Sequence, residues 1–335
     1  MPTLYLSEQG TRLSIKSERL LVWRGKDQLD DIPIIKVDRV VVMGRGIQVS
    51  NAALVFLAQQ GIPLVFTSRS NKFLASVSAG LGTNGAVRLA QATVVNETHR
   101  ALPIVQAIVA GKLANQHTLL ERYGTTWGGL GGRAKATIQQ MIQRTAQTGD
   151  ADQARGMEGA GAAAYWAAWV AVFLSGWGFA KRAYYPPPDP LNALLSFGYT
   201  LLLNDVLTAV QIVGLDPYLG FFHTVQHGRP SLALDLEEEF RAVVVDRTVL
   251  ELLDANAIRP DQFTAVPDKP GAIYATDSAR HAMIAAYEAR MNSPMRYRPT
   301  GTQETVRRVI LLQAYHLARV LTGGDAQYQP IGWDG

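Results

Sequence analysis

The periodicity of the apolar residues changes once along this chain, near residue 80, and that change limits the folds open to it. Between residue 3 and about residue 80, short runs carry Val, Ile, Leu or Tyr at alternate positions and end at Gly, Asp or Ser, as β-strands do. Beyond a glycine cluster at 80–85, apolar residues recur at helical spacing. The sequence therefore predicts an α+β protein, with a small N-terminal β domain at 1–82 and a larger all-α catalytic domain at 83–335.

These patterns also predict the individual elements. Strands are expected at 3–7, 12–17, 19–25, 33–44, 63–67 and 73–77, and a helix is expected to begin after Ser50 and to end before Gly61. Further helices are expected at 86–99, 101–123, 134–147, 154–179, 190–213, 236–253, 277–292 and 302–322. The glycine-rich segment 128–132 is interpreted as a loop, because it lacks the Lys-Ser/Thr pair of a phosphate-binding loop.

The composition excludes several kinds of chemistry. The 335 residues include no cysteine, which excludes disulfides, thiol nucleophiles, iron–sulfur centres and Cys-type zinc sites. Any metal site must then be built from Asp, Glu and His. The formal charge of +4 favours a polyanionic partner only weakly, because it is spread over the whole chain.

The location of the protein follows from two segments. The N-terminus lacks the basic and apolar regions of a secretory signal, so a cytoplasmic protein is expected. The uncharged segment 162–180 is long enough to cross a bilayer. It is rich in Ala, Gly and Trp, and no second span follows. A helix buried in a large helical domain is therefore the expectation, and a membrane protein is the alternative.

Candidate metal ligands gather in the segment 214–241. There His223 precedes a run of acids at 235–239, and leucines flank Asp235 on both sides. This apolar setting predicts burial, where an unpaired carboxylate is costly. Either Arg241 or a shared cation could offset that cost. Asp235 and Glu238 are three positions apart, so they lie on one helical face and could share an ion. A solvated, acidic helix start is the alternative.

Glu158 is the second buried-acid candidate. It stands near the start of a long apolar helix among small residues that would admit another backbone or the phosphates of a ligand. These neighbours are Gly156, Gly159, Ala160 and Gly161. If Glu158 meets His223 and Asp235, two carboxylates and one imidazole form a site that suits Mg²⁺ or Mn²⁺. Such a metal could activate water or a 3′-hydroxyl for attack on a phosphodiester.

Basic residues gather between 280 and 319. The seven arginines there are Arg280, Arg290, Arg296, Arg298, Arg307, Arg308 and Arg319, and they are set against two glutamates. Tyrosines are interleaved with them, as suits contact with DNA phosphates and bases. A solvated helical face is the alternative.

Three segments, in this order, resemble the CRISPR-associated integrase of spacer acquisition, the universal first-numbered Cas family. They are GMEGAGAAAYW at 156–166, DPLNALLSFGYTLL at 189–202 and GLDPYLGFFHTVQHGRPSLALDLEEEFR at 214–241. Weaker similarity extends through NAALVFLAQQGIPLVFTS at 51–68, IVAGKLANQ at 108–116 and YQPIGW at 328–333. The resemblance covers nearly the whole chain.

The resemblance implies that Glu158, His223 and Asp235 are catalytic metal ligands and that Glu238 accompanies them. It implies a Mg²⁺- or Mn²⁺-dependent DNA endonuclease and integrase, which joins the 3′-hydroxyl ends of short foreign duplexes to a CRISPR repeat by transesterification. The implied partners are double-stranded DNA (the protospacer and the repeat), a second copy in a homodimer paired by the β domain, and a small ferredoxin-like adaptation protein that bridges two dimers.

The residues expected to contact DNA form a second group. Asn192 and Tyr199 match family positions near the site, and His227 does not match the ligand position. The expected DNA contacts are Asn192, Tyr199, Arg229, Arg241, Arg296 and Arg298. Two other functions stay open: a metal-dependent nuclease acting on branched DNA in repair, and a noncatalytic DNA-binding assembly protein.

Overall fold

The computed structural model describes residues 3–68, 73–77, 84–265 and 270–333. The chain divides into two compact units, residues 1–81 and 82–335. The boundary expected after residue 82 falls within 78–83, outside the described residues.

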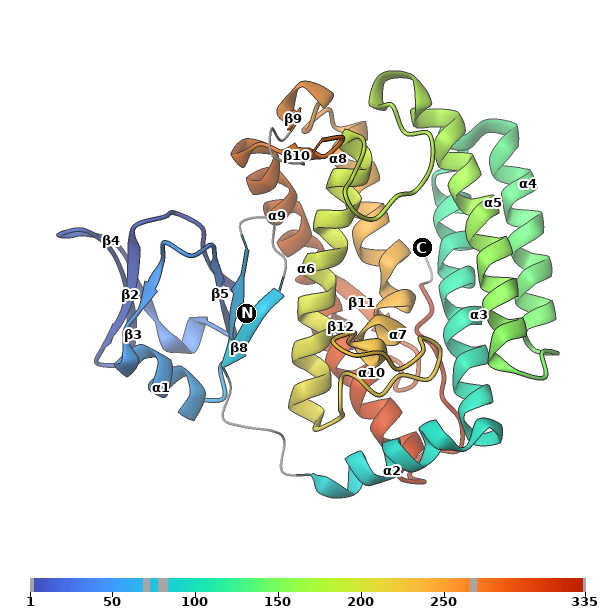
Figure 1. Cartoon of the computed structure of the whole chain (residues 1–335), viewed down its shortest axis with the longest axis horizontal. Helices are drawn as coiled ribbons and strands as arrows, with labels where there is room; N and C mark the ends of the chain where they lie inside the picture. Colours follow the sequence, from blue (N-terminus) through green and yellow to red (C-terminus); the bar gives the residue numbers. More distant parts are fainter. Residues whose placement is uncertain (1–2, 69–72, 78–83, 266–269, 334–335) are drawn as a thin grey trace. The chain divides into compact units, whose positions relative to one another are not determined.

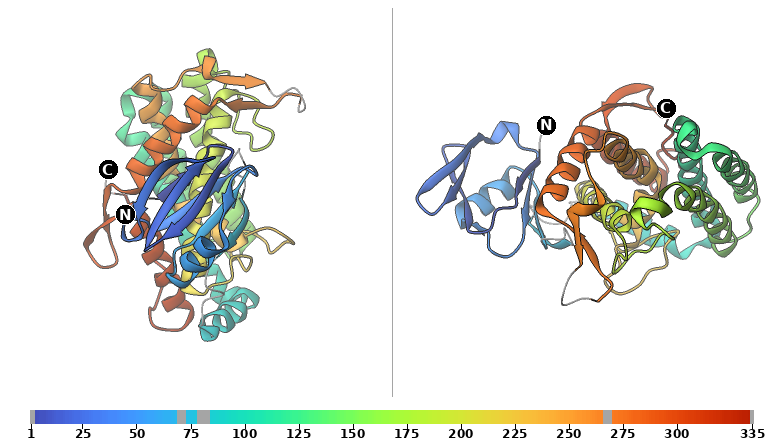
Figure 2. Two further views of the ribbon diagram at one scale, coloured as in Figure 1. Left: turned by 90° about the vertical axis from the view of Figure 1, so that its left-hand side faces the viewer. Right: turned by 90° about the horizontal axis from the view of Figure 1, so that it is seen from above.

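The described residues of the N-terminal unit form two four-stranded sheets, which are drawn in blue in Figure 2. In the first sheet the order is β1 (Thr3–Leu6), β5 (Arg39–Met43), β7 (Leu64–Thr67) and β8 (Phe73–Val77), and only β8 runs antiparallel to its neighbour. In the second sheet the order is β4 (Asp27–Pro33), β3 (Arg19–Arg24), β2 (Thr11–Lys16) and β6 (Gln48–Val49). Leu13 and Leu20 of the second sheet share one apolar core with Val40 and Leu64 of the first.

Helix α1 (Asn51–Gln59) begins where the sequence predicts, because the Ser50 hydroxyl accepts a hydrogen bond from the Ala53 amide at 3.2 Å. The single strand expected at 33–44 is instead divided. Strand β4 ends at Pro33, a short 3₁₀ turn covers Ile34–Lys36, and β5 begins at Arg39. Strand β4 escapes prediction because it is an exposed, polar strand at a sheet edge and lacks an apolar face.

The larger unit is mainly helical (Figure 1). Its helices are α2 (Gly85–Asn96), α3 (Thr98–Arg122), α4 (Gly124–Thr145), α5 (Ala151–Trp177), α6 (Pro190–Val213), α7 (Ser231–Phe240), α8 (Arg247–Asp254), α9 (Asp277–Met291) and α10 (Val306–Leu321). A π-helical segment, Arg241–Asp246, joins α7 to α8. Helices α3, α4 and α5 lie side by side, and α6 packs against α7 and α10.

The predicted α+β fold class is confirmed, although the larger unit also holds two short hairpins. Strand β9 (Phe263–Ala265) pairs with β10 (Ile273–Ala275), and β11 (Pro294–Tyr297) pairs with β12 (Thr302–Thr305). The helix expected at 302–322 therefore begins only at Val306. These strands are too short to show an alternating pattern against the surrounding helices.

The prediction of a loop at 128–132 is wrong, because this glycine-rich segment is part of α4. Trp127, which precedes it, is buried against Trp169 and Phe173, with ring centroids 5.5 and 6.3 Å apart. This packing of α4 against α5 outweighs the low helix propensity of glycine.

Among the described residues, α5 and α6 are long and apolar enough to cross a membrane by length and composition alone, so a second candidate span does follow the first. The apolar window of α6 is 78% buried inside the unit, as in the core helix of a globular protein. That of α5, the helix expected to be buried, is only 28% buried. Tyr165, Trp169 and Phe173 form the buried side of α5.

Candidate active site

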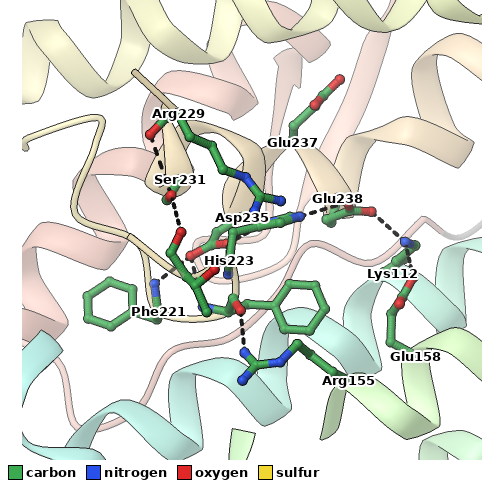
Figure 3. A network of polar contacts seen from close by, with 12 residues as sticks. Lys112, Arg155, Glu158, Phe221, His223, Arg229, Ser231, Asp235, Glu237 and Glu238 are labelled. Carbon is green, nitrogen blue, oxygen red and sulfur yellow. Dashed lines mark hydrogen bonds and ion pairs between the residues drawn. The ribbon is translucent and has the colours of Figure 1, made fainter. Parts of the chain in front are cut away.

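A cavity of about 490 Å³ opens between α3, α5, α7 and the two loops that flank α6. The charged and imidazole side chains on its wall are Lys112, Arg155, Glu158, His223, Arg229, Glu238 and Arg241. All of these except Arg241 are labelled in Figure 3. Asp235 is not on this wall, although it lies one helical turn from Glu238.

Asp235 instead shapes the loop that carries His223. The side chain is fully buried, and its Oδ2 accepts hydrogen bonds from the Phe221 amide at 2.6 Å and the Phe222 amide at 3.0 Å. Its Oδ1 accepts from the His223 amide at 2.8 Å and lies 2.7 Å from His223 Nδ1. Since Asp235 can only accept from Nδ1–H, the free Nε2 of the imidazole faces the cavity.

The loop also needs a glycine and an arginine to reach this shape. A Cβ at Gly220 would lie 2.7 Å from the Ser231 backbone and 2.9 Å from Asp235 Oδ2, so no larger residue fits. Arg155 of α5 donates to the Phe222 carbonyl at 2.7 Å and ties the loop to the helix that carries Glu158. The loop therefore places His223 through main-chain contacts on both sides.

Glu238 and Glu158 face each other across the Lys112 ammonium. Lys112 Nζ lies 2.6 Å from Glu238 Oε2 and is also hydrogen-bonded to Glu158 Oε1. Arg241 contacts Glu238 on its other oxygen at 2.7 Å. Burial alone would raise the pKa of Glu238, but Arg241 and Lys112 outweigh burial and lower this pKa to about 2. Glu238 is therefore a carboxylate at neutral pH.

The Lys112 ammonium stays charged as well. Burial alone would lower the pKa of Lys112, but the charges of Glu238 and Glu158 outweigh it and raise the pKa. Helices α3, α5 and α7 thus bring one ammonium and two acidic side chains into contact.

The donors in the cavity suit a divalent cation. Glu158, Glu238 and His223 Nε2 are oxygen and nitrogen donors of the kind that Mg²⁺ or Mn²⁺ accepts, and Nε2 lies 3.9 Å from Glu238 Oε1. Glu238 Oε2 is buried, and the Lys112 ammonium lies 2.6 Å from it. As the side chains stand, however, no three His, Asp or Glu side chains of the described residues are grouped closely enough to hold a metal. The ammonium of Lys112 stands between the carboxylates instead.

Two of the expected DNA contacts are interior residues. Asn192 is fully buried, where its side chain bonds to Asp189, to the Lys181 carbonyl and to Arg182. Tyr199 is buried too and donates to Asp246 at 2.5 Å. The sequence motifs indicated that Asn192 and Tyr199 lie near the site, but they did not indicate that the two side chains are buried. In the structure both side chains have a packing role.

The expected arginine contacts differ from one another. Arg241 holds the acids of α7, with Nη2 2.9 Å from Glu237 Oε2 in addition to its contact with Glu238, so this side chain is occupied within the site. Arg229 lies on the cavity wall (Figure 3). Arg296 and Arg298 are exposed at the hairpin of β11 and β12.

The predicted basic cluster at 280–319 is largely neutralised. Arg290 pairs with Glu251 at 2.5 Å, Arg307 with Asp205 at 3.1 Å and Glu288 at 2.7 Å, and Arg319 with Asp325 at 2.8 Å. Arg280 pairs with Asp277. Counting charges within 280–319 missed these partners, because four of the five acids lie outside that range.

Sequence reasoning missed Lys112 and Arg155 as site residues. Lys112 lies in IVAGKLANQ, a segment of weak family similarity, and the available signal was a charged residue within an apolar helical segment. Asn115 of the same segment donates to the Glu239 carbonyl at 2.8 Å, so this motif contacts α7 at two positions.

Solved structures of other proteins share this fold. A casposase bound to its integration product matches with a TM-score of 0.85 and 21% identity, over 98% of this chain and 93% of that one. A Cas6-RT-Cas1–Cas2 complex matches with a TM-score of 0.82 and 21% identity, over 98% of this chain and 36% of that one. The chain therefore has the fold shared by casposases and Cas1 proteins.

The family follows from sequence. The family model for CRISPR associated protein Cas1 matches residues 4–289. A protein of Thermus thermophilus named CRISPR-associated endonuclease Cas1 3 is 32% identical over 98% of this chain and 94% of its own length. The chain belongs to the Cas1 family, as its motifs predicted.

Proposed function

We propose that this protein is a metal-dependent DNA endonuclease and integrase of spacer acquisition, which joins the 3′-hydroxyl ends of short duplexes to a CRISPR repeat. The main support for the proposal is that Glu158, His223 and Glu238 line one cavity whose other charged side chains are all basic. The names of similar proteins, a CRISPR-associated endonuclease and a casposase bound to integration product, agree with this chemistry.

Glu158, Glu238 and His223 Nε2 would hold Mg²⁺ or Mn²⁺. When bound, such an ion supplies Lewis-acid polarisation of a phosphodiester and favours deprotonation of the attacking oxygen. Arg229 on the wall would orient the phosphate and balance the charge that develops on its oxygens, while Arg155 holds the Phe222 carbonyl of the loop. The buried carboxylate of Asp235 keeps the His223 ring in the tautomer and direction that leave Nε2 free.

This assignment changes the expected ligand set. Glu238 takes the place of Asp235 as the third ligand, because Glu238 lies on the cavity wall while all the contacts of Asp235 point to the loop. Asp235 becomes a positioning residue.

The partners proposed are those of a spacer-acquisition complex. Double-stranded DNA is the substrate, a second copy of the chain forms a homodimer, and a small adaptation protein bridges two dimers in the cytoplasm. The match to a chain in a Cas6-RT-Cas1–Cas2 complex supports a protein partner in adaptation.

The test is strand joining of a labelled duplex with 3′-hydroxyl ends into a supercoiled plasmid that carries a repeat, with the small adaptation protein present. We expect joining with Mg²⁺ or Mn²⁺, none with EDTA, and none for His223→Ala. His227→Ala is the matched control, since His227 is exposed in the same loop, and it should join normally. Metal-independent joining, or normal joining by His223→Ala, would reject the proposed site. Cleavage of branched DNA without joining would favour a repair nuclease.

A further inference from the structure

Lys112 is an unusual feature of the cavity because it is a buried cation in the apolar helix α3. Only 8% of the residue is exposed, and lysine is rarely so buried unless it is paired. Its ammonium contacts Glu158 of α5 and Glu238 of α7. Without a cation between them, these two largely buried carboxylates would repel each other. Lys112 thus stabilises the meeting of the three helices.

The position of the ammonium is also the position where the two proposed ligands converge. Lys112 Nζ lies 2.6 Å from Glu238 Oε2, not far beyond the roughly 2.0–2.2 Å at which small divalent ions bind carboxylate oxygens. An ammonium and a divalent ion cannot occupy this space together, because they overlap and repel. The flexible four-carbon stem of lysine allows the ammonium to move along the cavity.

We propose that Lys112 is a resident cation of the metal site, which holds Glu158 and Glu238 together and oriented before the ion binds and leaves that position when Mg²⁺ or Mn²⁺ enters. This inference rests on the proposed function. If Lys112 occupies the position of the ion, the two compete, and this competition sets the affinity of the protein for the metal. The site stays assembled without metal, and it binds the ion more weakly than its donors alone would.

The first test compares Mn²⁺ binding by wild type and Lys112→Met, measured from the electron paramagnetic resonance signal of free Mn²⁺. Methionine keeps an unbranched side chain and removes the charge. We expect Lys112→Met to bind Mn²⁺ about tenfold more tightly, and its melting temperature to fall without metal and recover more than that of wild type when Mn²⁺ is added. Equal or weaker binding by Lys112→Met would overturn the inference.

Lys135→Met is the matched control. Lys135 lies on α4, and its ammonium is 3.9 Å from the exposed Glu121, so its removal should leave Mn²⁺ affinity unchanged. A similar gain in Lys135→Met would show a general charge effect and would also overturn the inference.

A second measurement uses the wild-type chain and does not depend on the folding of a variant. Lysine acetylation is followed by mass spectrometry with and without saturating Mn²⁺, with the exposed Lys181 as the internal standard. We expect Mn²⁺ to accelerate modification of Lys112 in wild type but not in His223→Ala. An unchanged or slower rate in wild type overturns the displacement of Lys112.

The two proposals fail in different ways. If neither wild type nor Lys112→Met binds Mn²⁺, the proposed metal site fails and the inference fails with it. If both bind Mn²⁺ equally, the metal site stands and only the role of Lys112 is rejected.

Discussion

Asp235 and Glu238 differ in role although they share one face of α7. Asp235 accepts three main-chain hydrogen bonds and one contact from an imidazole nitrogen, whereas Glu238 is held by two cations at the cavity wall. The first arrangement supports the loop, and the second presents a carboxylate to a ligand.

The difference predicts unequal losses of stability when the two kinds of side chain are removed. Asp235→Ala leaves the buried amides of Phe221, Phe222 and His223 without an acceptor, so we expect a loss of about 3 kcal/mol in the free energy of unfolding. His223→Ala removes a side chain at the cavity surface and should cost about 1 kcal/mol or less. Urea denaturation measures both. Equal losses would contradict the positioning role of Asp235.

Glu239, the next residue on α7, links this helix to the C-terminal segment. Its Oε2 accepts from the Ile331 amide at 2.8 Å and from Gln313 at 3.2 Å, and Tyr328 donates to Oε1. Burial raises the pKa of Glu239 to about 8 despite these hydrogen bonds. The folded protein therefore retains a proton that the unfolded chain has released between about pH 4.5 and 8.

A pH dependence follows from this raised pKa. The contribution of the Glu239 carboxyl to the free energy of unfolding is fully present below the ordinary pKa of glutamate. It is lost as the pH rises through about 8. Glu239→Gln cannot ionise, so the stability of this variant relative to wild type should rise between pH 5 and 8, by about 1 kcal/mol or more. Urea denaturation at several pH values tests this change, with the exposed Glu121→Gln as control. A constant difference would show that Glu239 does not titrate in this range.

At the scale of elements, the glycines of α5 have unequal packing. A Cβ at Gly161 would lie 2.4 Å from Leu113 Cδ2 on α3, whereas nothing lies within 4 Å of one at Gly156 or Gly159. The expected close approach around Glu158 is therefore a contact between helices at Gly161. It sets the spacing of α3 and α5, and so of Lys112 and Glu158.

This contact predicts that Gly161→Ala destabilises the larger unit by about 1–3 kcal/mol through overpacking. Gly159→Ala, two positions earlier and exposed, should stabilise it by about 0.5–1 kcal/mol, because alanine is the better helix former. Thermal unfolding compares the two. A loss from both substitutions would show that Gly159 faces a partner in the assembled protein.

At the scale of the whole molecule, few of the C-terminal arginines remain for DNA. The ion pairs of Arg290, Arg307 and Arg319 serve the fold. Arg296, Arg298 and Arg308 are exposed and stay candidates for contact with DNA. Salt-dependent DNA binding in this region should therefore depend on few residues.

Arg296→Ala should weaken DNA binding uniformly across sequences and lower the slope of log affinity against log salt by about one. Arg307→Ala should instead reduce the free energy of unfolding by about 3 kcal/mol, since it leaves Asp205 and Glu288 without their shared cation. Fluorescence anisotropy over a salt series and urea denaturation separate these effects. An unchanged salt slope for Arg296→Ala would remove the hairpin from the DNA interface.

Local patterns determined the element types and the kinds of donor. The Ser50 cap, the helix at 190–213 and the change of period near residue 80 depend on neighbours in sequence, so they were predicted. The motifs around Glu158, His223 and Glu238 likewise reveal which side chains can bind a metal, because residue type alone sets donor chemistry.

Only the tertiary structure decided which carboxylate faces the cavity, and which cations neutralise it. Lys112 reaches Glu158 across 46 residues, and Arg307 reaches Asp205 across 102. Asp235 turns toward the loop because the main chain folds back over it at Gly220. Such contacts join distant segments, and their energies depend on burial that no local window of sequence contains.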